Sequence, residues 1–183
     1  MRLPFINSMV DYLNVNMILV GYRGYGPSEG FPSEDGIKLD VQAILKYVLK
    51  DLKSDINLKN LYILGRSLGG ACAIYAQSMF PSEIKGLILE NTFLSIEDLV
   101  DRFFPFLKYI KNILLRNKWL SKDLINKIED PIYFIMSEKD EIVPFEHMTK
   151  LYELASKSKN KKKVSFIDKS TQFQMPLITM DFR

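Results

Sequence analysis

One serine in this sequence stands where its hydroxyl could act as a nucleophile. Ser67 is the centre of a Gly-x-Ser-x-Gly pattern that runs from Gly65 to Gly69. Four apolar residues, Leu61 to Leu64, precede the pattern and small apolar residues follow it, which predicts a buried strand, a sharp turn and a buried helix. Such a turn needs glycine where a Cβ would meet the neighbouring backbone, and it exposes the serine Oγ. The pattern therefore predicts attack by Ser67 on an ester or thioester carbonyl.

The backbone next to Ser67 favours the same chemistry. The N–H of Leu68 stands at the start of the predicted helix, where it can donate to the oxygen that becomes negative during the attack. We therefore expect Leu68 to be an oxyanion donor, with Gly65 and Gly69 shaping the turn. A glycine-rich turn between a strand and a helix also occurs for packing alone, so the prediction depends on what surrounds it.

The composition limits the classes of protein and partner. A chain of 183 residues is long enough for one domain with a core, and 47% hydrophobic with 26% charged residues is ordinary for a globular protein. A net charge of +3 spread over the chain argues against nucleic acid as a partner. The single cysteine, Cys72, excludes an internal disulfide and predicts a buried, inert thiol. One histidine and one cysteine cannot form a zinc shell, so we expect no metal and no other cofactor.

The order of the predicted strands and helices indicates an α/β fold. Five apolar stretches are typical of buried strands: residues 16–20, 61–64, 86–91, 132–136 and 164–167. Helices are predicted over residues 1–13, from an N-cap at Ser33 to about residue 52, over residues 71–76, and from about residue 144. Because strands and helices alternate with few hairpin signals, we predict a mostly parallel sheet with helices on both faces.

Residues 95–127 interrupt this alternation. They show no strand pattern but are rich in aromatic and aliphatic residues, with lysine and arginine between them. As helices inserted between two strands, they would form a cap over Ser67 with an apolar pocket. The alternative interpretation is a face that lies on a membrane surface, since basic and aromatic residues are interleaved. No apolar run in the sequence is long enough to span a membrane.

The segment Gly21–Gly30 is glycine-rich and follows a predicted strand, as a phosphate-binding loop would. Its spacing matches neither the dinucleotide pattern Gly-x-Gly-x-x-Gly nor the P-loop, which ends in Gly-Lys-Ser/Thr. We therefore predict a tight structural loop rather than a nucleotide site.

Four motifs occur in the order found in one known family: Gly21–Gly30, Gly65–Gly70, Glu90–Ile96 and Asp140–Pro144. On these motifs the chain resembles the α/β-hydrolase superfamily over nearly its whole length. It is most similar to the branch of alpha/beta-hydrolase domain-containing protein 13 and its bud-emergence-type, serine aminopeptidase S33-like relatives. That resemblance implies a partial α/β-hydrolase fold of about five strands.

The resemblance implies catalysis through an acyl-enzyme. By it, Ser67 corresponds to the nucleophile and Asp140 to the acid that orients a catalytic histidine. An aspartate after a strand is also an ordinary cap or turn residue, which is the alternative for Asp140. The implied substrates are small-molecule or lipid esters, or S-acylated proteins, as for a lipid esterase or a depalmitoylase.

The resemblance stops at the catalytic base. Where the family has its histidine, this chain has Thr171 or Gln172, and neither can accept the serine proton near neutral pH. The one histidine, His147, is expected to be a solvent-facing or helix-end residue. We therefore expect the chain as given to be nearly inert. Two hypotheses remain: a truncated or mis-spliced serine hydrolase, and a non-catalytic relative that keeps the pocket for binding or scaffolding.

The resemblance also divides the chain and predicts a gap in its sheet. It implies a partial hydrolase domain over residues 1–168, with the helical cap over 95–127, and an atypical tail over 169–183. In the family, a strand ending in His-Gly-Asn precedes the first helix and lies between the strands at 16–20 and 61–64. Without it these strands would be about 10 Å apart. We expect them either to close up or to leave backbone groups unpaired, in a marginal or sticky protein.

The cellular location follows from the resemblance only in broad terms. We expect a cytoplasmic or membrane-associated protein, with any membrane anchor upstream of this chain. The sequence leaves the oligomeric state open.

Overall fold

The structure of the chain is a computed structural model that describes residues 3–52, 56–104, 106, 115–167 and 178–182. Its helices are α1 (Leu3–Leu13), α2 (Glu34–Lys50), the short 3-10 helix η1 (Leu58–Asn60), α3 (Leu68–Met79), α4 (Ile96–Phe103), α6 (Ser121–Ile125) and α7 (Phe145–Leu154). Its strands are β1 (Val15–Leu19), β2 (Leu61–Arg66), β3 (Gly86–Glu90), β4 (Ile132–Ser137), β5 (Lys161–Phe166) and β6 (Ile178–Phe182).

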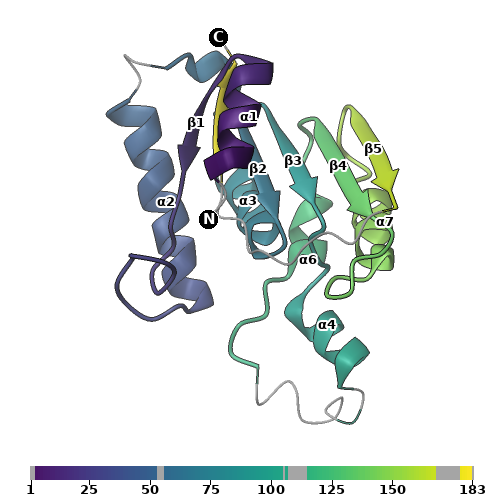
Figure 1. The fold of residues 1–183 in the computed structure, drawn as a ribbon. Coiled ribbons are helices and arrows are strands. Elements are labelled where there is room, and N and C mark those ends of the chain that lie inside the picture. The colour runs from purple at the N-terminus through teal and green to yellow at the C-terminus, as the bar shows by residue number, and fades with distance from the viewer. Residues whose placement is uncertain (1–2, 53–55, 105, 107–114, 168–177, 183) are drawn as a thin grey trace.

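These strands form one six-stranded sheet in the order β1-β6-β2-β3-β4-β5. Strands β2, β3, β4 and β5 pair in parallel. Strand β6 pairs antiparallel with both β1 and β2, so β1 runs in the same direction as β2. The carboxyl ends of the parallel strands therefore share one edge, the lower edge in Figure 1, and α4 projects beyond it. The predicted mostly parallel α/β sheet is confirmed, with one strand more than expected.

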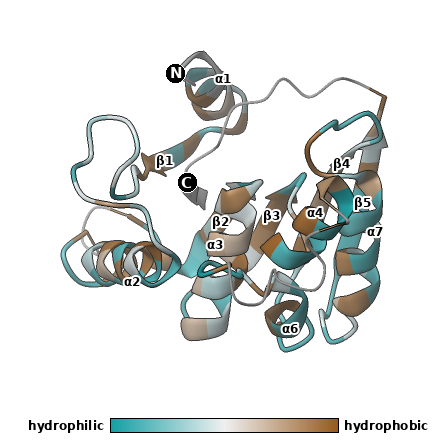
Figure 2. Ribbon diagram, turned by 90° about the horizontal axis from the view of Figure 1, so that it is seen from below, coloured by the Kyte–Doolittle hydropathy of each residue, from teal (hydrophilic) through white to brown (hydrophobic). Residues whose placement is uncertain are grey.

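Helices cover both faces of the sheet, as predicted. Helices α2, α3, α6 and α7 lie on one face and α1 lies on the other (Figure 2). The first face holds the main core, in which Ile63 of β2, Ile74 of α3 and Phe134 of β4 are fully buried. On the second face, Leu64 of β2 packs with Met9 of α1. Alternate residues of β2 thus serve opposite faces, as the period of a strand requires.

Helix α2 begins where its sequence predicts. The Oγ of Ser33 accepts the N–H of Gly36 at 3.2 Å, which satisfies one of the donors that every helix leaves unpaired at its start. Glu34 and Asp35 follow in the first turn, where carboxylates interact favourably with the helix dipole. The predicted N-cap is confirmed.

The predicted gap in the sheet is wrong, because β6 fills it. This strand comes from the tail that matched no family motif, and it lies between β1 and β2. Its residues align with β1 from Val15 to Leu19 and with β2 from Leu61 to Leu64. The two strands therefore do not close up, and β6 presents backbone partners to both of them. The tail's residues 178–182 belong to the same sheet as the rest of the fold.

Strand β5 starts earlier than predicted, at Lys161 rather than at residue 164. The first three residues of β5 are lysines, and a run of charged residues does not predict a strand. At a sheet edge they are common, since they discourage pairing with another chain. The ammonium groups of Lys161 and Lys163 both lie over the ring of Tyr152, at 4.6 and 4.9 Å from its centre, where the ring attracts them.

Candidate active site

Ser67 occupies the turn between β2 and α3 in a conformation that few serines adopt. Its φ is 51° and its ψ is −122°. A positive φ in a residue with a Cβ is strained and persists only where surrounding contacts hold it. Two contacts do so: the N–H of Ser67 donates to the carbonyl of Glu90 at 3.0 Å, and Thr92 Oγ1 donates to the carbonyl of Ser67 at 2.7 Å. The half-buried serine is therefore fixed in this turn by the last residue of β3 and by Thr92, which follows that strand.

Glycines make room for this turn. A Cβ on Gly65 would lie 2.2 Å from the carbonyl oxygen of Gly69, which is backbone and cannot swing aside. Gly70 is equally confined, since a Cβ there would lie 2.4 Å from the Cβ of Thr92. Gly65 and Gly69 were expected to shape the turn, whereas Gly70 was expected only to end the motif. The signal for it was the pair Gly69-Gly70 at the start of a buried helix, where α3 packs closely on the segment after β3.

Leu68 is the first residue of α3. Its N–H donates to no acceptor in the part of the chain that the structure describes. This is the usual state of the first donors of a helix, and it leaves a donor with partial positive charge beside Ser67. The geometry at this position suits an oxyanion donor.

Asp140 lies in the turn that follows β4. Its Oδ1 accepts the N–H of Ile142 at 2.9 Å and that of Val143 at 2.8 Å, which is an Asx turn. Since β2 and β4 are parallel with β3 between them, Ser67 and Asp140 lie at the same edge of the sheet, two strands apart. The structure thus brings the two predicted residues to one edge, while the contacts of Asp140 Oδ1 are those of a turn residue.

Asn91 links the ends of β3 and β4 at this edge of the sheet, a role not predicted from the sequence. It follows β3 with a φ of 42°, and its buried Oδ1 accepts the N–H of Ser137 at the end of β4, at 2.7 Å. Asparagine tolerates a positive φ better than most residues. Its place in the Glu90–Ile96 motif was the available signal. The contact fixes the ends of β3 and β4 relative to each other.

His147 is a helix-end residue, as one of the two expectations had it, but it does not face solvent. The side chain lies in the first turn of α7 and only 7% of the residue is exposed. Its Nδ1 accepts the N–H of Leu94 at 3.2 Å, so the neutral ring carries its proton on Nε2. Burial lowers the pKa of His147, and Asp98 and Glu146 counteract only part of that effect. The segment after β3 covers the start of α7, which a helical pattern alone does not reveal.

Thr171 and Gln172, which occupy the position of the family's histidine, lie outside the described residues. No three potential metal ligands among histidine, cysteine and acidic residues gather within the described ranges.

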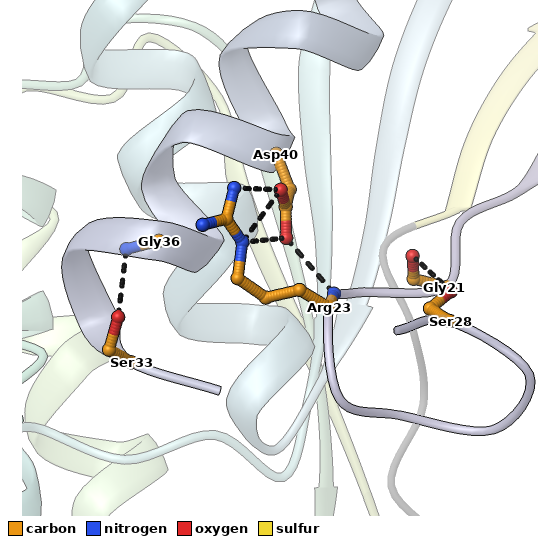
Figure 3. Close-up of polar contacts among 6 residues, drawn as sticks. All are labelled: Gly21, Arg23, Ser28, Ser33, Gly36 and Asp40. Atoms are coloured by element: carbon orange, nitrogen blue, oxygen red, sulfur yellow. Dashed lines mark hydrogen bonds and ion pairs between the residues drawn. The ribbon is translucent and has the colours of Figure 1, made fainter. Parts of the chain in front are cut away.

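The glycine-rich loop at Gly21–Gly30 is stabilised by hydrogen bonds within the loop and by a contact with α2 (Figure 3). The N–H of Gly24 donates to the carbonyls of Ser28 and Glu29, at 3.2 and 3.1 Å. Arg23 binds Asp40 of α2 through its backbone N–H and its guanidinium, with the shortest contact at 2.6 Å. This bond holds the pKa of Asp40 below its ordinary value. The loop has the geometry of a tight structural loop, as predicted, because its amides serve its own carbonyls.

Cys72 is fully buried in α3, and its burial raises the pKa of the thiol to about 12. The thiolate that reactive cysteines require is therefore absent near neutral pH. The prediction of a buried, inert thiol is confirmed.

The inserted segment, residues 95–127, is described in part and contributes α4 and α6. Ser95 caps α4, since its Oγ accepts the N–H of Asp98 at 3.0 Å. At the far end of α4 the aromatic side chains of Phe103, Phe104 and Phe106 are exposed, Phe106 at 74%. These three rings are exposed apolar surface. Helix α4, at whose end they stand, projects beyond the carboxyl edge of the sheet (Figure 1).

Comparisons with known proteins agree with this architecture. Residues 5–112 match the family described as alpha/beta hydrolase fold. The chain is 44% identical over 149 residues to a Saccharomyces cerevisiae protein named uncharacterized membrane protein YNL320W, covering 80% of this chain and 51% of that protein. It is 32% identical over 201 residues to lysophosphatidylserine lipase ABHD12 of Danio rerio, covering 95% of this chain and 52% of that protein.

Among solved structures, an alpha-beta hydrolase from Vibrio vulnificus has a similar fold. The TM-score is 0.66 at 22% sequence identity, over 81% of this chain and 55% of that chain. This chain spans about half the length of the curated relatives it matches. Within the described ranges, no helix is both long enough and apolar enough to cross a bilayer.

Proposed function

Since this chain belongs to the alpha/beta hydrolase fold family, we propose that it acts as a serine hydrolase of ester or thioester type, with Ser67 as the nucleophile. One observation carries the proposal: the residue at the turn has a φ of 51° and is a serine. Glycine would adopt this φ without strain, so packing gives no reason for a side chain here. A nucleophilic hydroxyl that points out of the turn would explain why the residue is a serine.

The proposed reaction runs through an acyl-enzyme. The Oγ of Ser67 attacks the carbonyl carbon of the substrate and its proton passes to a base, while the N–H of Leu68 donates to the developing oxyanion. The proton then passes to the leaving alkoxide or thiolate, which departs. Water attacks the acyl-enzyme in the same way and regenerates the Ser67 hydroxyl. Asp140, at the same edge, would orient the base.

The base is the missing part of the proposed machinery. The Nδ1 of His147 is engaged by Leu94, and the position of the family's histidine carries Thr171 or Gln172. We therefore propose that this 183-residue chain reacts slowly at Ser67 and that turnover depends on an imidazole that the chain does not place there. A general base is worth about 10²–10⁴ in rate.

Lipid esters are the substrate class that we propose first, with S-acylated proteins as the alternative. Phe103, Phe104 and Phe106 offer exposed apolar surface at the edge that carries Ser67. One relative is named a lysophosphatidylserine lipase, and another is named a membrane protein. The same exposed rings, with Arg102 and Arg116 near them in the sequence, support contact of this edge with a membrane surface.

A fluorophosphonate probe tests the assignment of Ser67. We expect slow labelling of the wild type, acceleration of about 10-fold or more by imidazole in the buffer, since imidazole replaces part of a general base, and no labelling of Ser67→Ala. Ser78→Ala is the matched control, because the Oγ of Ser78 donates to the carbonyl of Tyr75 within α3. A folded wild type that stays unlabelled with and without imidazole would contradict the proposal.

A non-catalytic binding or scaffold protein is the second candidate. The engagement of His147 Nδ1 by Leu94 favours it, because Nε2 of the neutral ring then carries the proton and cannot accept another from Ser67. In this case a non-hydrolysable lysophospholipid ether would bind the wild type and Ser67→Ala alike, and imidazole would not promote hydrolysis of the corresponding ester.

A further inference from the structure

A carboxylate at the start of α2 holds a short stretch in the second half of the inserted segment. We call residues 117–119, which precede α6, the returning leg. The Oε2 of Glu34 accepts the N–H of Lys118 at 2.5 Å and that of Trp119 at 2.9 Å. In the opposite direction, the N–H of Glu34 donates to Oδ1 of Asn117 at 2.8 Å. The returning leg is therefore bound to α2 through three hydrogen bonds at one residue.

The other oxygen of this carboxylate is also engaged. Lys38, one turn along α2, donates to Oε1 of Glu34 at 2.6 Å. Its ammonium lies 5.4 Å from the ring centre of Tyr75 on α3 and 5.7 Å from that of Trp119. Burial acts to raise the pKa of Glu34, but Lys38 and the two backbone amides outweigh it and hold that pKa below its ordinary value. The carboxylate therefore stays ionised near neutral pH and accepts strong, charge-assisted hydrogen bonds.

Trp119 needs such support. It is buried at 4% exposure, and its φ is 44°, which is strained for a large side chain. A residue in this state persists only where its surroundings over-determine it. The peptide groups on either side of Lys118, next to the strained residue, each donate a hydrogen bond to Glu34.

The two legs of the insertion are joined at their base as well. Ile96 donates to the carbonyl of Lys118 at 2.8 Å, and Lys122 donates through its N–H to the carbonyl of Leu94 at 3.0 Å. The ammonium of Lys122 binds Asp98 of α4 at 2.9 Å. A displacement of the returning leg therefore moves the start of α4, which follows directly on the segment that fastens Ser67 and His147.

We propose that Glu34 is a positioning residue that fixes the returning leg against α2 and so sets where the inserted segment lies relative to Ser67. Its consequence for catalysis rests on the proposed function, whereas the positioning itself does not. Release of Glu34 would free the returning leg, relax Trp119 and loosen the base of the insertion without touching the Ser67 turn.

Trp119 is the single tryptophan of the chain, so its emission reports on this contact directly. In Glu34→Ala we expect the emission to move toward that of the unfolded chain. Cleavage by trypsin after Arg116 should become about 10²-fold faster, as expected for the loss of two hydrogen bonds to a charged acceptor. Glu129→Ala is the matched control, because Glu129 is exposed and its contact with Lys159 is 3.7 Å long. We expect no change in it.

Two further measurements keep the proposal testable if Glu34→Ala does not fold. Glu34→Gln keeps an acceptor but lacks the charge that binds Lys38, and it should give an intermediate rate of cleavage. In the wild type, acid should shift the Trp119 emission below pH 4.5 as Glu34 loses the charge that binds Lys38 and the backbone N–H groups of Lys118 and Trp119, and this step should vanish in Glu34→Gln. Folded Glu34 variants with unchanged emission and cleavage would overturn the proposal. Failure of Ser67 to react with the probe would remove the proposed function alone.

Discussion

The Ser67 turn and the slot between β1 and β2 both adjoin β2, yet the chain specifies them in opposite ways. The turn is signalled within a few residues, since Gly65, Ser67 and Gly69 stand together in the sequence and a Cβ on Gly65 would meet the carbonyl of Gly69. The slot is filled by β6, which is the last of the six strands in chain order. A local backbone conformation can be inferred from neighbouring residues, whereas the neighbour of a strand depends on which distant segment is available.

Gly65→Ala should test the turn with the largest effect. A Cβ at this position would lie 2.2 Å from the carbonyl oxygen of Gly69. We expect the free energy of unfolding to fall by about 4 kcal/mol or more, which is the range of severe core strain. Urea denaturation followed by circular dichroism would measure it. In Gly26→Ala, where φ is 59° but no atom lies within 4 Å, the loss should be about 1–2 kcal/mol. Equal losses at both positions would contradict the steric account of the turn.

Thr179→Pro tests the slot. Thr179 aligns with Ile18 on β1 and with Ile63 on β2, so its N–H lies inside the sheet whichever neighbour it faces. Proline removes this donor and does not fit an interior strand, and we expect a loss of about 3 kcal/mol in the free energy of unfolding. Thr179→Val, which keeps the N–H, should retain most of the stability. An unchanged urea midpoint in Thr179→Pro would show that β6 contributes nothing to the sheet.

Ser67→Gly tests the strain in the turn, because removing the strain should raise the free energy of unfolding. The strained φ of Ser67 costs roughly 1–3 kcal/mol, and glycine avoids this cost. Glycine also makes the unfolded chain more flexible, which lowers the free energy of unfolding by about 0.5–1 kcal/mol. We expect a net stabilisation on the order of 1 kcal/mol. Ser82→Gly, in an exposed turn without a positive φ, should give a small loss instead. Destabilisation of similar size at both serines would argue against strain at Ser67.

The smallest effect concerns pH. Because burial lowers the pKa of His147 in the folded chain, the unfolded chain binds the proton more readily. The free energy of unfolding should therefore keep its full value above the ordinary histidine pKa near 6.5 and decline as the pH falls below it. His147→Gln keeps an acceptor for Leu94 and removes the titration. Urea midpoints between pH 5 and 8 should be flatter in this variant, and an equal slope in both proteins would refute the assignment.

Much of the fold was predictable because its elements are local. The N-cap at Ser33, the apolar strand before Ser67 and the buried small residues of α3 each follow from a few adjacent side chains. What could not be predicted depends on which segments, far apart in the sequence, pair with each other. Nothing in the residues 178–182 themselves indicates that they pair with β1 and β2, and the resemblance to a family gave no counterpart for them.

The site divides in the same way. Gly65 was predictable from the tightness of the turn, but Gly70 depends on Thr92, and the burial of His147 depends on Leu94. The N-cap at Ser33 implies only that Glu34 lies in a first helical turn, whereas its partners Lys118 and Trp119 are far along the chain. In each case the missing information was a contact made by the segment after β3 or by the returning leg.

The position of β6 has a consequence for the order of folding during synthesis. Domains assemble as they leave the ribosome, with the amino-terminal parts first. The block of β2 to β5 can form early, but β1 can be paired into the sheet only when β6 emerges, because β6 lies between β1 and β2. Until then two strand edges remain open to other nascent chains, and a chaperone that shields them would have the most to protect.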